Sequence, residues 1–282
     1  MKPHPATTAR LLTAALSGTF AIAVTACSAG GTGAGSSPAS AASPAFVNTA
    51  KVLTLTAARA RRATSFTATI DSSTSGTYST HVHGTLAEQT RPALLADEKF
   101  TVTAAGIAVP GGMEALVAGN AIYLKMSSLS RMAGKPWVRL SFSSLKSGTG
   151  VSLGPLVRQL QASSPLSFAQ MLPAARHVRQ VGTATISGVP TTEYTGTLDP
   201  LRALARLDPG LRKLVRPAYT AAGSTSGTFT VWLDSQYQLR KLILVQAGPQ
   251  HRSTTTMVVT SVNQPVHVQI PPAGQTAAMP GL

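Results

Sequence analysis

The stretch Thr228-Phe229-Thr230-Val231-Trp232-Leu233-Asp234 decides what kind of structure this chain forms. Phe229, Val231 and Leu233 occupy every second position, which is the pattern of a β-strand that buries one of its two faces. Residues 119–120, Gly-Asn, predict a tight hairpin turn between two such segments. Further strands are predicted at 66–71, 82–86, 94–104, 114–118, 121–126, 137–140, 239–246, 254–262 and 266–270.

Helices are predicted between these blocks of strands. A helix over Phe46–Ala63 follows from apolar residues at helical spacing, and arginines in its last turn complement the helix dipole. A short helix is expected after Pro155. Three more helices are expected at start signals in which a capping residue precedes a proline, namely Ser164-Pro165, Asp199-Pro200 and Asp208-Pro209.

The order of these elements indicates the fold class. Strands come in blocks and do not alternate regularly with helices, so we expect an α+β fold in which an antiparallel sheet carries helices on one face. Residues 46–275 are expected to form a single domain, a length that is usual for one large β architecture. Residues 276–282 are expected to be a disordered tail.

The N-terminus has the pattern of a bacterial lipoprotein signal. Lys2 and Arg10 precede an apolar run that is too short for a membrane-spanning helix, and the run ends in Val24-Thr25-Ala26-Cys27, which has the form of a lipobox. We therefore expect residues 1–26 to be a signal peptide and Cys27 to carry acyl chains such as palmitate. The protein would then be anchored by these chains to the outer face of the cell membrane. The alternative is an ordinary secretory signal cleaved after Ala26, with Cys27 incidental.

Composition indicates how the anchored chain would meet its surroundings. Residues 27–45 are mostly Ser, Gly, Ala, Thr and Pro, and are expected to form a flexible tether. The formal net charge is +15, and +13 remains once Lys2 and Arg10 leave with the signal. Such a charge favours anionic lipid head groups or wall polymers, whereas the low aromatic content of 5% and the predicted export argue against nucleic acid. A basic surface that is merely solvated is an equal alternative.

Catalytic, metal and cofactor sites are not expected. His81 and His83 share one face of a predicted strand, as two zinc ligands could, but this is the predicted solvent side, so an exposed histidine pair is the default. The segment Gly223-Ser224-Thr225-Ser226-Gly227 has threonine where a nucleophile elbow needs serine. Nine acidic residues in the whole chain leave little for acid–base pairs.

Three later segments, together with the lipobox and the tether, resemble a known family. Residues 181–194 resemble its strand pair VG…I.GV.TT.Y, residues 230–234 resemble its strand vWLD, and residues 262–271 resemble its closing strand. This family is the LppX/LprG-like lipoproteins of actinobacteria, which are related in fold to the periplasmic lipoprotein carrier LolA. The resemblance covers most of residues 46–272.

The resemblance implies a strongly curved antiparallel half-barrel with helices covering its concave face and an apolar cavity between them. Family members bind lipids or glycolipids there, so we expect a monomeric, non-enzymatic protein that carries or presents such a ligand. Alternation by itself predicts a buried face and not a void, so the same side chains would equally fill a core. The expected lining residues are Phe66, Ile70, Leu156, Leu160, Leu172, Leu204, Leu214, Phe229, Val231 and Leu233.

A second hypothesis is an interaction or sensor module of the cell envelope. Such a protein would use its basic surface on wall polymers or on a protein partner and would hold no acyl chain. The two hypotheses differ in whether the concave face binds hydrocarbon.

Overall fold

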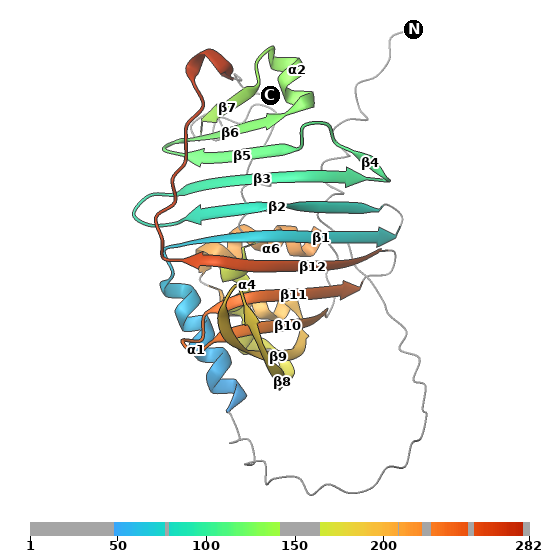
Figure 1. Ribbon diagram of the computed structural model, residues 1–282, viewed down its shortest axis with the longest axis vertical. Coiled ribbons are helices and arrows are strands. Elements are labelled where there is room, and N and C mark those ends of the chain that lie inside the picture. Colours follow the sequence, from blue (N-terminus) through green and yellow to red (C-terminus); the bar gives the residue numbers. More distant parts are fainter. Residues whose placement is uncertain are drawn as a thin grey trace, which may run out of the picture.

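A computed structural model of the chain describes residues 48–76, 79–141, 164–207, 209–221, 227–247 and 251–278 and is dominated by one long sheet (Figure 1). The strands of the described residues are β1 (Ser65–Gly76), β2 (Thr80–Gln89), β3 (Leu95–Ala104), β4 (Ile107–Ala108), β5 (Met113–Ala118), β6 (Ala121–Met126), β7 (Trp137–Ser141), β8 (Arg176–Ile186), β9 (Val189–Leu198), β10 (Gly227–Asp234), β11 (Leu239–Ala247), β12 (His251–Val262) and β13 (Thr276–Ala278). Their order from edge to edge is β13-β7-β6-β5-β3-β2-β1-β12-β11-β10-β9-β8, with β4 paired to β3. All pairs are antiparallel except β13 with β7, which confirms the predicted antiparallel sheet.

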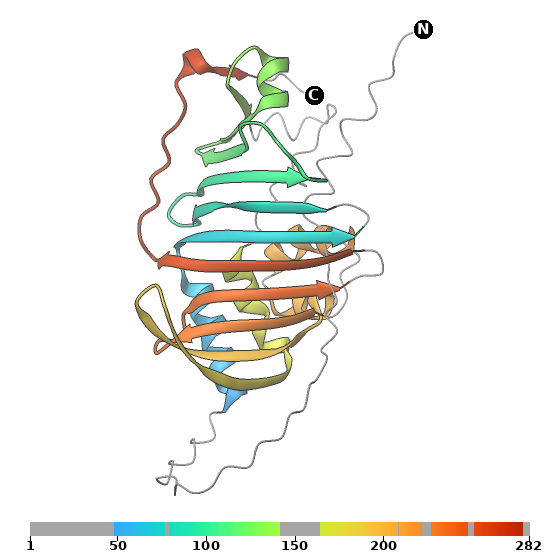
Figure 2. The ribbon, with the colours of Figure 1, turned by 45° about the vertical axis from the view of Figure 1, so that its right-hand side comes forward.

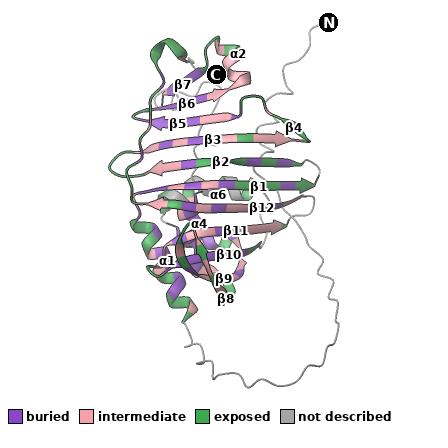
Figure 3. Ribbon diagram, in the orientation of Figure 1, coloured by how far each residue is buried: buried purple, intermediate pink, exposed green. Residues whose placement is uncertain are grey.

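The alternation of apolar and polar residues in the sequence gives the sheet one buried and one exposed face. Buried and exposed residues alternate along β2 from Thr80 to Leu86 (Figure 3). In β10 the residues Phe229, Val231 and Leu233 are at most 1% exposed. A strand buries every second side chain when only one of its faces packs against other elements, as here.

Capping side chains mark the starts of two predicted helices, although α1 begins at Thr49 and not at Phe46, and α2 was not predicted. Asn48 precedes the first helix, and its side-chain oxygen accepts a hydrogen bond from the Lys51 backbone N–H at 3.1 Å. Asp199 accepts one from the Arg202 N–H at 3.1 Å. Such caps satisfy backbone donors that have no partner inside the helix. The helices are α1 (Thr49–Arg62), α2 (Ser127–Ala133), α4 (Pro165–Met171), α5 (Pro200–Ala203) and α6 (Pro209–Ala221), with 3₁₀ turns η2 (Leu172–Ala174), η3 (Leu204–Arg206) and η4 (Ala273–Gln275).

The sheet curves, and α4 and α6 lie on the same side of the half that contains β12 to β8 (Figure 2). α1 packs against α4 and η2 on this side. Register shifts interrupt the pairing of β1 with β12, of β10 with β11, and of β8 with β9. Such irregularities bend and twist a sheet. The α+β fold, with a curved open sheet and helices on one face, is therefore confirmed.

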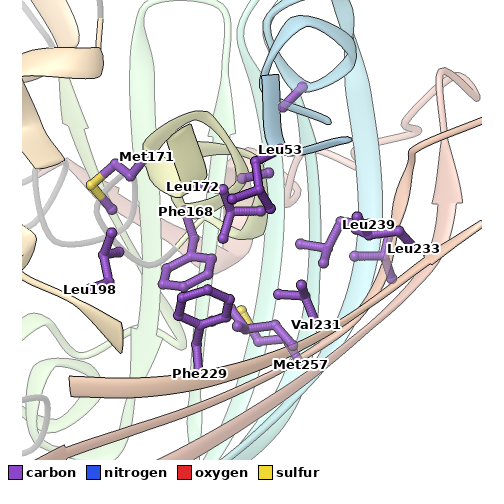
Figure 4. Close-up of a cluster of buried hydrophobic side chains, with 14 of the residues drawn as sticks. Leu53, Phe168, Met171, Leu172, Leu198, Phe229, Val231, Leu233, Leu239 and Met257 are labelled. Carbon is purple, nitrogen blue, oxygen red and sulfur yellow. The ribbon is translucent and has the colours of Figure 1, made fainter. Parts of the chain in front are cut away.

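The main core lies between this face and the helices. Phe168 of α4 meets Phe229 of β10 edge to face, with ring centroids 5.8 Å apart and an angle of 71° between the rings (Figure 4). Met257 of β12 and Leu53 of α1 belong to the same buried cluster. An edge-to-face pair adds about 0.5–1.5 kcal/mol to the energy of burial. The contact therefore holds α4 against β10.

The C-terminal segment differs from the prediction in two ways. Residues 266–270, expected as a strand, form no regular structure, and 276–278, expected in a disordered tail, form β13 against β7. Prolines at 265, 271 and 272 explain the first difference, because proline has no N–H to donate to a ladder. The left-handed backbone of Asn263, with φ of 60°, turns the chain out of β12. The segment then runs along the sheet to its far edge (Figure 1).

Several predicted features lie outside the described residues. These are the signal peptide with Val24, Thr25, Ala26 and Cys27, the tether, Asp208, the helix predicted after Pro155, and residues 279–282. Within the described ranges, none of the helices has both the length and the hydropathy required to cross a membrane.

Candidate functional site

The face of the sheet that packs against α1 and α4, here called the concave face, carries two apolar clusters. The first joins β1, β2 and β9 to β12 with α1, α4, η2, α5 and η3. The second lies on β3 and β5 to β7, and its buried members are Ala96, Ala115, Val117, Ile122, Leu124, Val138 and Leu140. Cross-strand register places both clusters on the same face, because Leu86 of the first cluster and Ala115 of the second both align with residue 98 of β3. The concave face is therefore apolar across most of the sheet.

The predicted lining residues that the structure describes all belong to the first cluster. Each of them is at most 5% exposed, and they are Phe66, Ile70, Leu172, Leu204, Phe229, Val231 and Leu233. Leu214 lies in α6, but its side chain is outside the described part of the structure. Leu156 and Leu160 also lie outside the described residues. The structure thus brings seven of the ten expected residues together in one buried layer.

A small hollow opens in this layer between α4 and the sheet. Its lining residues are Phe168, Met171, Leu198, Pro200, Gly227, Leu244 and Gln246. The enclosed space is about 10 Å³, which is close to the room that one water molecule needs. In the described conformation this hollow has no room for an acyl chain, so hydrocarbon could enter the hollow only if α4 or its neighbours moved away from the sheet.

Two acidic residues, Glu88 and Glu98, interrupt the apolar concave face, and neither was among the residues predicted for the site. Glu98 aligns with Leu86 of the first cluster on one side and Ala115 of the second on the other. In the neighbouring row, Glu88 aligns with Phe66 and Ala96. Each carboxyl therefore stands between the two clusters. The sequence did contain a signal for Glu98. This residue lies two residues after Ala96 and two before Phe100, so strand alternation places all three side chains on the same face.

The surroundings of these carboxyls favour their neutral forms. Glu98 is 3% exposed, and in the part of the chain that the structure describes its Oε2 atom has no hydrogen-bond partner. Burial raises the pKa of Glu98 from 4.5 to about 8, with smaller contributions from repulsion by Glu88 and Asp97. Burial likewise raises the pKa of Glu88 from 4.5 to about 7. At neutral pH Glu98 is thus mostly protonated, and the pair carries much less than two full charges.

The opposite, convex face carries the predicted histidine pair. His81 Nε2 and His83 Nδ1 lie 3.0 and 3.3 Å from the same oxygen, Oδ2 of Asp71. The side chains are 51% and 61% exposed, which confirms that this is the solvent side. Cross-strand pairing supplies the carboxylate, which sequence proximity could not reveal. In the described part of the chain, no group of three or more His, Cys, Asp or Glu side chains is arranged to hold a metal ion.

Comparison with known sequences gives two partial relatives. An uncharacterised 31.2 kDa protein of Streptomyces griseus, encoded between rplA and rplJ, is 32% identical over 38% of this chain and 36% of its own length. A protein of Streptomyces coelicolor, whose name describes a candidate lipoprotein, is 27% identical over 58% of this chain and 50% of its own length. The chain thus spans only a third to a half of these relatives. No family model matches the sequence.

The solved structures that resemble this chain include two mycobacterial proteins, LprF and the lipoprotein LppX. LprF of Mycobacterium bovis is 14% identical, with a TM-score of 0.48, over 79% of this chain and 96% of its own. LppX of Mycobacterium tuberculosis is 18% identical, with a TM-score of 0.42, over 78% of this chain and 98% of its own. The fold itself rests on the strand order and packing described above.

Proposed function

We propose that this chain is an acylated lipoprotein on the outer face of the cell membrane that binds a lipid between its sheet and helices, and carries or presents it. The observation that carries the proposal is the apolar concave face, which extends over both clusters and is covered by short helices in its first half. Burial of hydrocarbon contributes about 0.8 kcal/mol per methylene group, so one acyl chain can supply strong binding without any reactive group. The lipobox and the relatives' names add support.

Lipid entry through the hollow beside α4 requires this hollow to widen. Phe168 and Met171 line it from the helix, and Leu244 and Gln246 line it from β11. α4 has only seven residues and is followed directly by the 3₁₀ turn η2. Methionine is unbranched and adapts to irregular spaces. We therefore place the entrance at α4, where a small displacement would join the hollow to the rest of the concave face.

Replacement of Cys27 tests the anchor. In the wild-type protein, expressed in an actinobacterial host, the mature N-terminus should carry acyl chains and fractionate with membranes. Cys27→Ala removes the thiol that would be acylated, so the protein should lose the lipid mass and leave the membrane fraction. Mass spectrometry of the intact protein measures both. A mass that changes only by the difference between cysteine and alanine, with an unchanged membrane distribution, would favour the ordinary secretory signal.

A bulky substitution in the hollow tests the lipid site. Native mass spectrometry of the full-length protein, purified from a membrane-containing host, should show a bound species that organic solvent releases. Leu244→Trp, which fills the hollow, should reduce its occupancy about tenfold, as expected for a loss of ~1.4 kcal/mol. Ile243→Trp is the matched control, because residue 243 is the neighbour in the same strand and points to the opposite face.

A basic envelope-interaction module is the second candidate. Arg59, Arg61 and Arg62 at the end of α1, together with Arg202 and Arg206, are exposed. Exposed charges attract anionic polymers in a manner that salt screens. A protein that carries no extractable lipid, and whose binding to anionic polymers falls with rising salt, would favour this module over a lipid carrier.

A further inference from the structure

Glu98 lies in the least favourable place on the sheet for an acidic side chain. It is 3% exposed on the concave face, and its cross-strand neighbours on that face are Leu86 and Ala115, one from each apolar cluster. Glu88 lies diagonally from it, between Phe66 and Ala96. A hydrophobic residue at position 98 would extend the apolar layer without interruption. The buried carboxyl therefore lowers the stability of the folded protein, which suggests that it has a functional role.

The unpaired oxygen of Glu98 is a second, independent observation that indicates a ligand. Oε2 of Glu98 is buried and has no hydrogen-bond partner among the described residues, whereas buried polar atoms in proteins are nearly always paired. Two hydroxyls have the same property, Oγ1 of Thr56 on the buried side of α1 and Oγ1 of Thr80 on the concave face of β2. Among the described residues, unpaired buried oxygens therefore occur on the concave face of the sheet and on the buried side of α1. One further such atom, Oδ1 of Asp97, lies on the opposite face of β3. A bound molecule with polar groups would provide a partner for those on the concave face.

We propose that Glu98, with Glu88 beside it, is a polar subsite in the floor of the lipid site, and that it pairs with a free hydroxyl group of the ligand. The apolar clusters on either side would hold the hydrocarbon that flanks this hydroxyl. The inference rests on the proposed function and names the ligand class. The protein would select lipids that carry an unesterified hydroxyl next to their acyl chains, and would disfavour lipids whose polar groups only accept hydrogen bonds.

A hydroxyl suits this site better than a cationic group does. The raised pKa values of Glu88 and Glu98 favour protonated carboxyls, and a protonated carboxyl both donates and accepts, as a hydroxyl does. A neutral pair buries no net charge. An ammonium group would have to lose its own hydration on entry, which a buried ion pair often fails to offset.

Two lipids that differ in one hydrogen-bond donor test the subsite. They are 1,2-dioleoylglycerol and 1,2-dioleoyl-3-acetylglycerol, which have the same acyl chains but a free or an acetylated hydroxyl. Their dissociation constants are measured on the full-length, lipid-stripped protein by native mass spectrometry. The wild type should bind the free alcohol about 10- to 100-fold more tightly, because the ester leaves a buried partner unpaired.

Three variants assign the preference to Glu98. Glu98→Met keeps the length of the side chain and removes its polar atoms, so both lipids should bind about equally. Glu98→Gln keeps an acceptor and a donor at the same place and should retain the preference. Glu193→Gln changes a glutamate of β9 outside the two clusters and should behave as the wild type. Circular dichroism checks that each variant is folded. If Glu98→Met does not fold, the comparison of Glu98→Gln with the wild type still tests the preference.

The outcomes separate this inference from the proposed function. If the wild type binds both lipids with equal affinity, the lipid site stands and the hydroxyl subsite is wrong. If Glu98→Met keeps the full preference for the free alcohol, another group binds the hydroxyl and the assignment to Glu98 is overturned. If neither lipid binds to any of the proteins, the lipid site itself fails, and the subsite fails with it.

Discussion

Raising the pH from 5 to 9 is expected to lower the free energy of unfolding of the lipid-stripped protein by on the order of 5 kcal/mol. The main cause is the buried Glu98, and the partly buried Glu88 acts in the same direction. Burial raises the pKa of Glu98 from 4.5 to about 8 and that of Glu88 to about 7. At about 1.4 kcal/mol per pKa unit, the shift of Glu98 alone accounts for this magnitude.

The sign follows from proton binding in the two states. In the unfolded chain both carboxyls ionise near 4.5, so between that pH and about 8 the folded protein binds more protons than the unfolded chain. Stability therefore falls as the pH rises through this window and levels off above it. Urea unfolding at pH 5, 7 and 9, extrapolated to zero denaturant, measures the change.

Replacement of Glu98 should remove most of this dependence. Glu98→Gln cannot ionise, so the variant should be several kcal/mol more stable than the wild type at pH 9 and close to it at pH 5. Glu193→Gln, which removes a glutamate that is partly exposed, should leave the profile of the wild type unchanged. A wild-type stability that stays constant between pH 5 and 9 would contradict the burial of a protonated Glu98.

Local patterns were enough to predict most of the fold. Alternation at 228–234 identified β10, and the signals at Ser164-Pro165 and Asp199-Pro200 placed the starts of α4 and α5 within one residue. These elements are specified by nearest neighbours in the chain, through strand periodicity and capping. Antiparallel order followed from strands that come in blocks. The local signal was therefore sufficient wherever the structure depends on contacts within a few residues.

The candidate site depends instead on contacts between distant residues. Glu98 is interpretable only when its strand is aligned with Leu86 and Ala115, and sequence periodicity does not give the register between strands. β13 forms because the segment after β12 crosses to the edge strand β7, a pairing of residues about 140 positions apart. The small volume of the hollow depends on how side chains fill space, and alternation predicts only which face is buried.

Gly84→Ala is expected to destabilise the protein by about 3 kcal/mol, although alanine suits the interior of a strand better than glycine does. Gly84 lies on the concave face of β2, opposite Phe100 of β3, whose ring covers the place where a side chain would be. A β-carbon at this position would lie 2.1 Å from the carbonyl oxygen of Lys99 and 2.6 Å from Cδ1 of Phe100. The ring can rotate, but the carbonyl belongs to the strand ladder, so β2 and β3 would have to separate.

Gly182→Ala provides the control for this prediction, since the nearest atom to its added β-carbon is 3.8 Å away, an ordinary contact. Its free energy of unfolding should change by no more than about 0.5–1 kcal/mol, with stabilisation the expected direction. Phe100→Leu combined with Gly84→Ala should recover only part of the loss, because the carbonyl contact persists. Urea unfolding of the four proteins measures these differences. Full recovery in the double variant would show that the aromatic ring alone excludes a side chain from this place, and that the strands themselves do not.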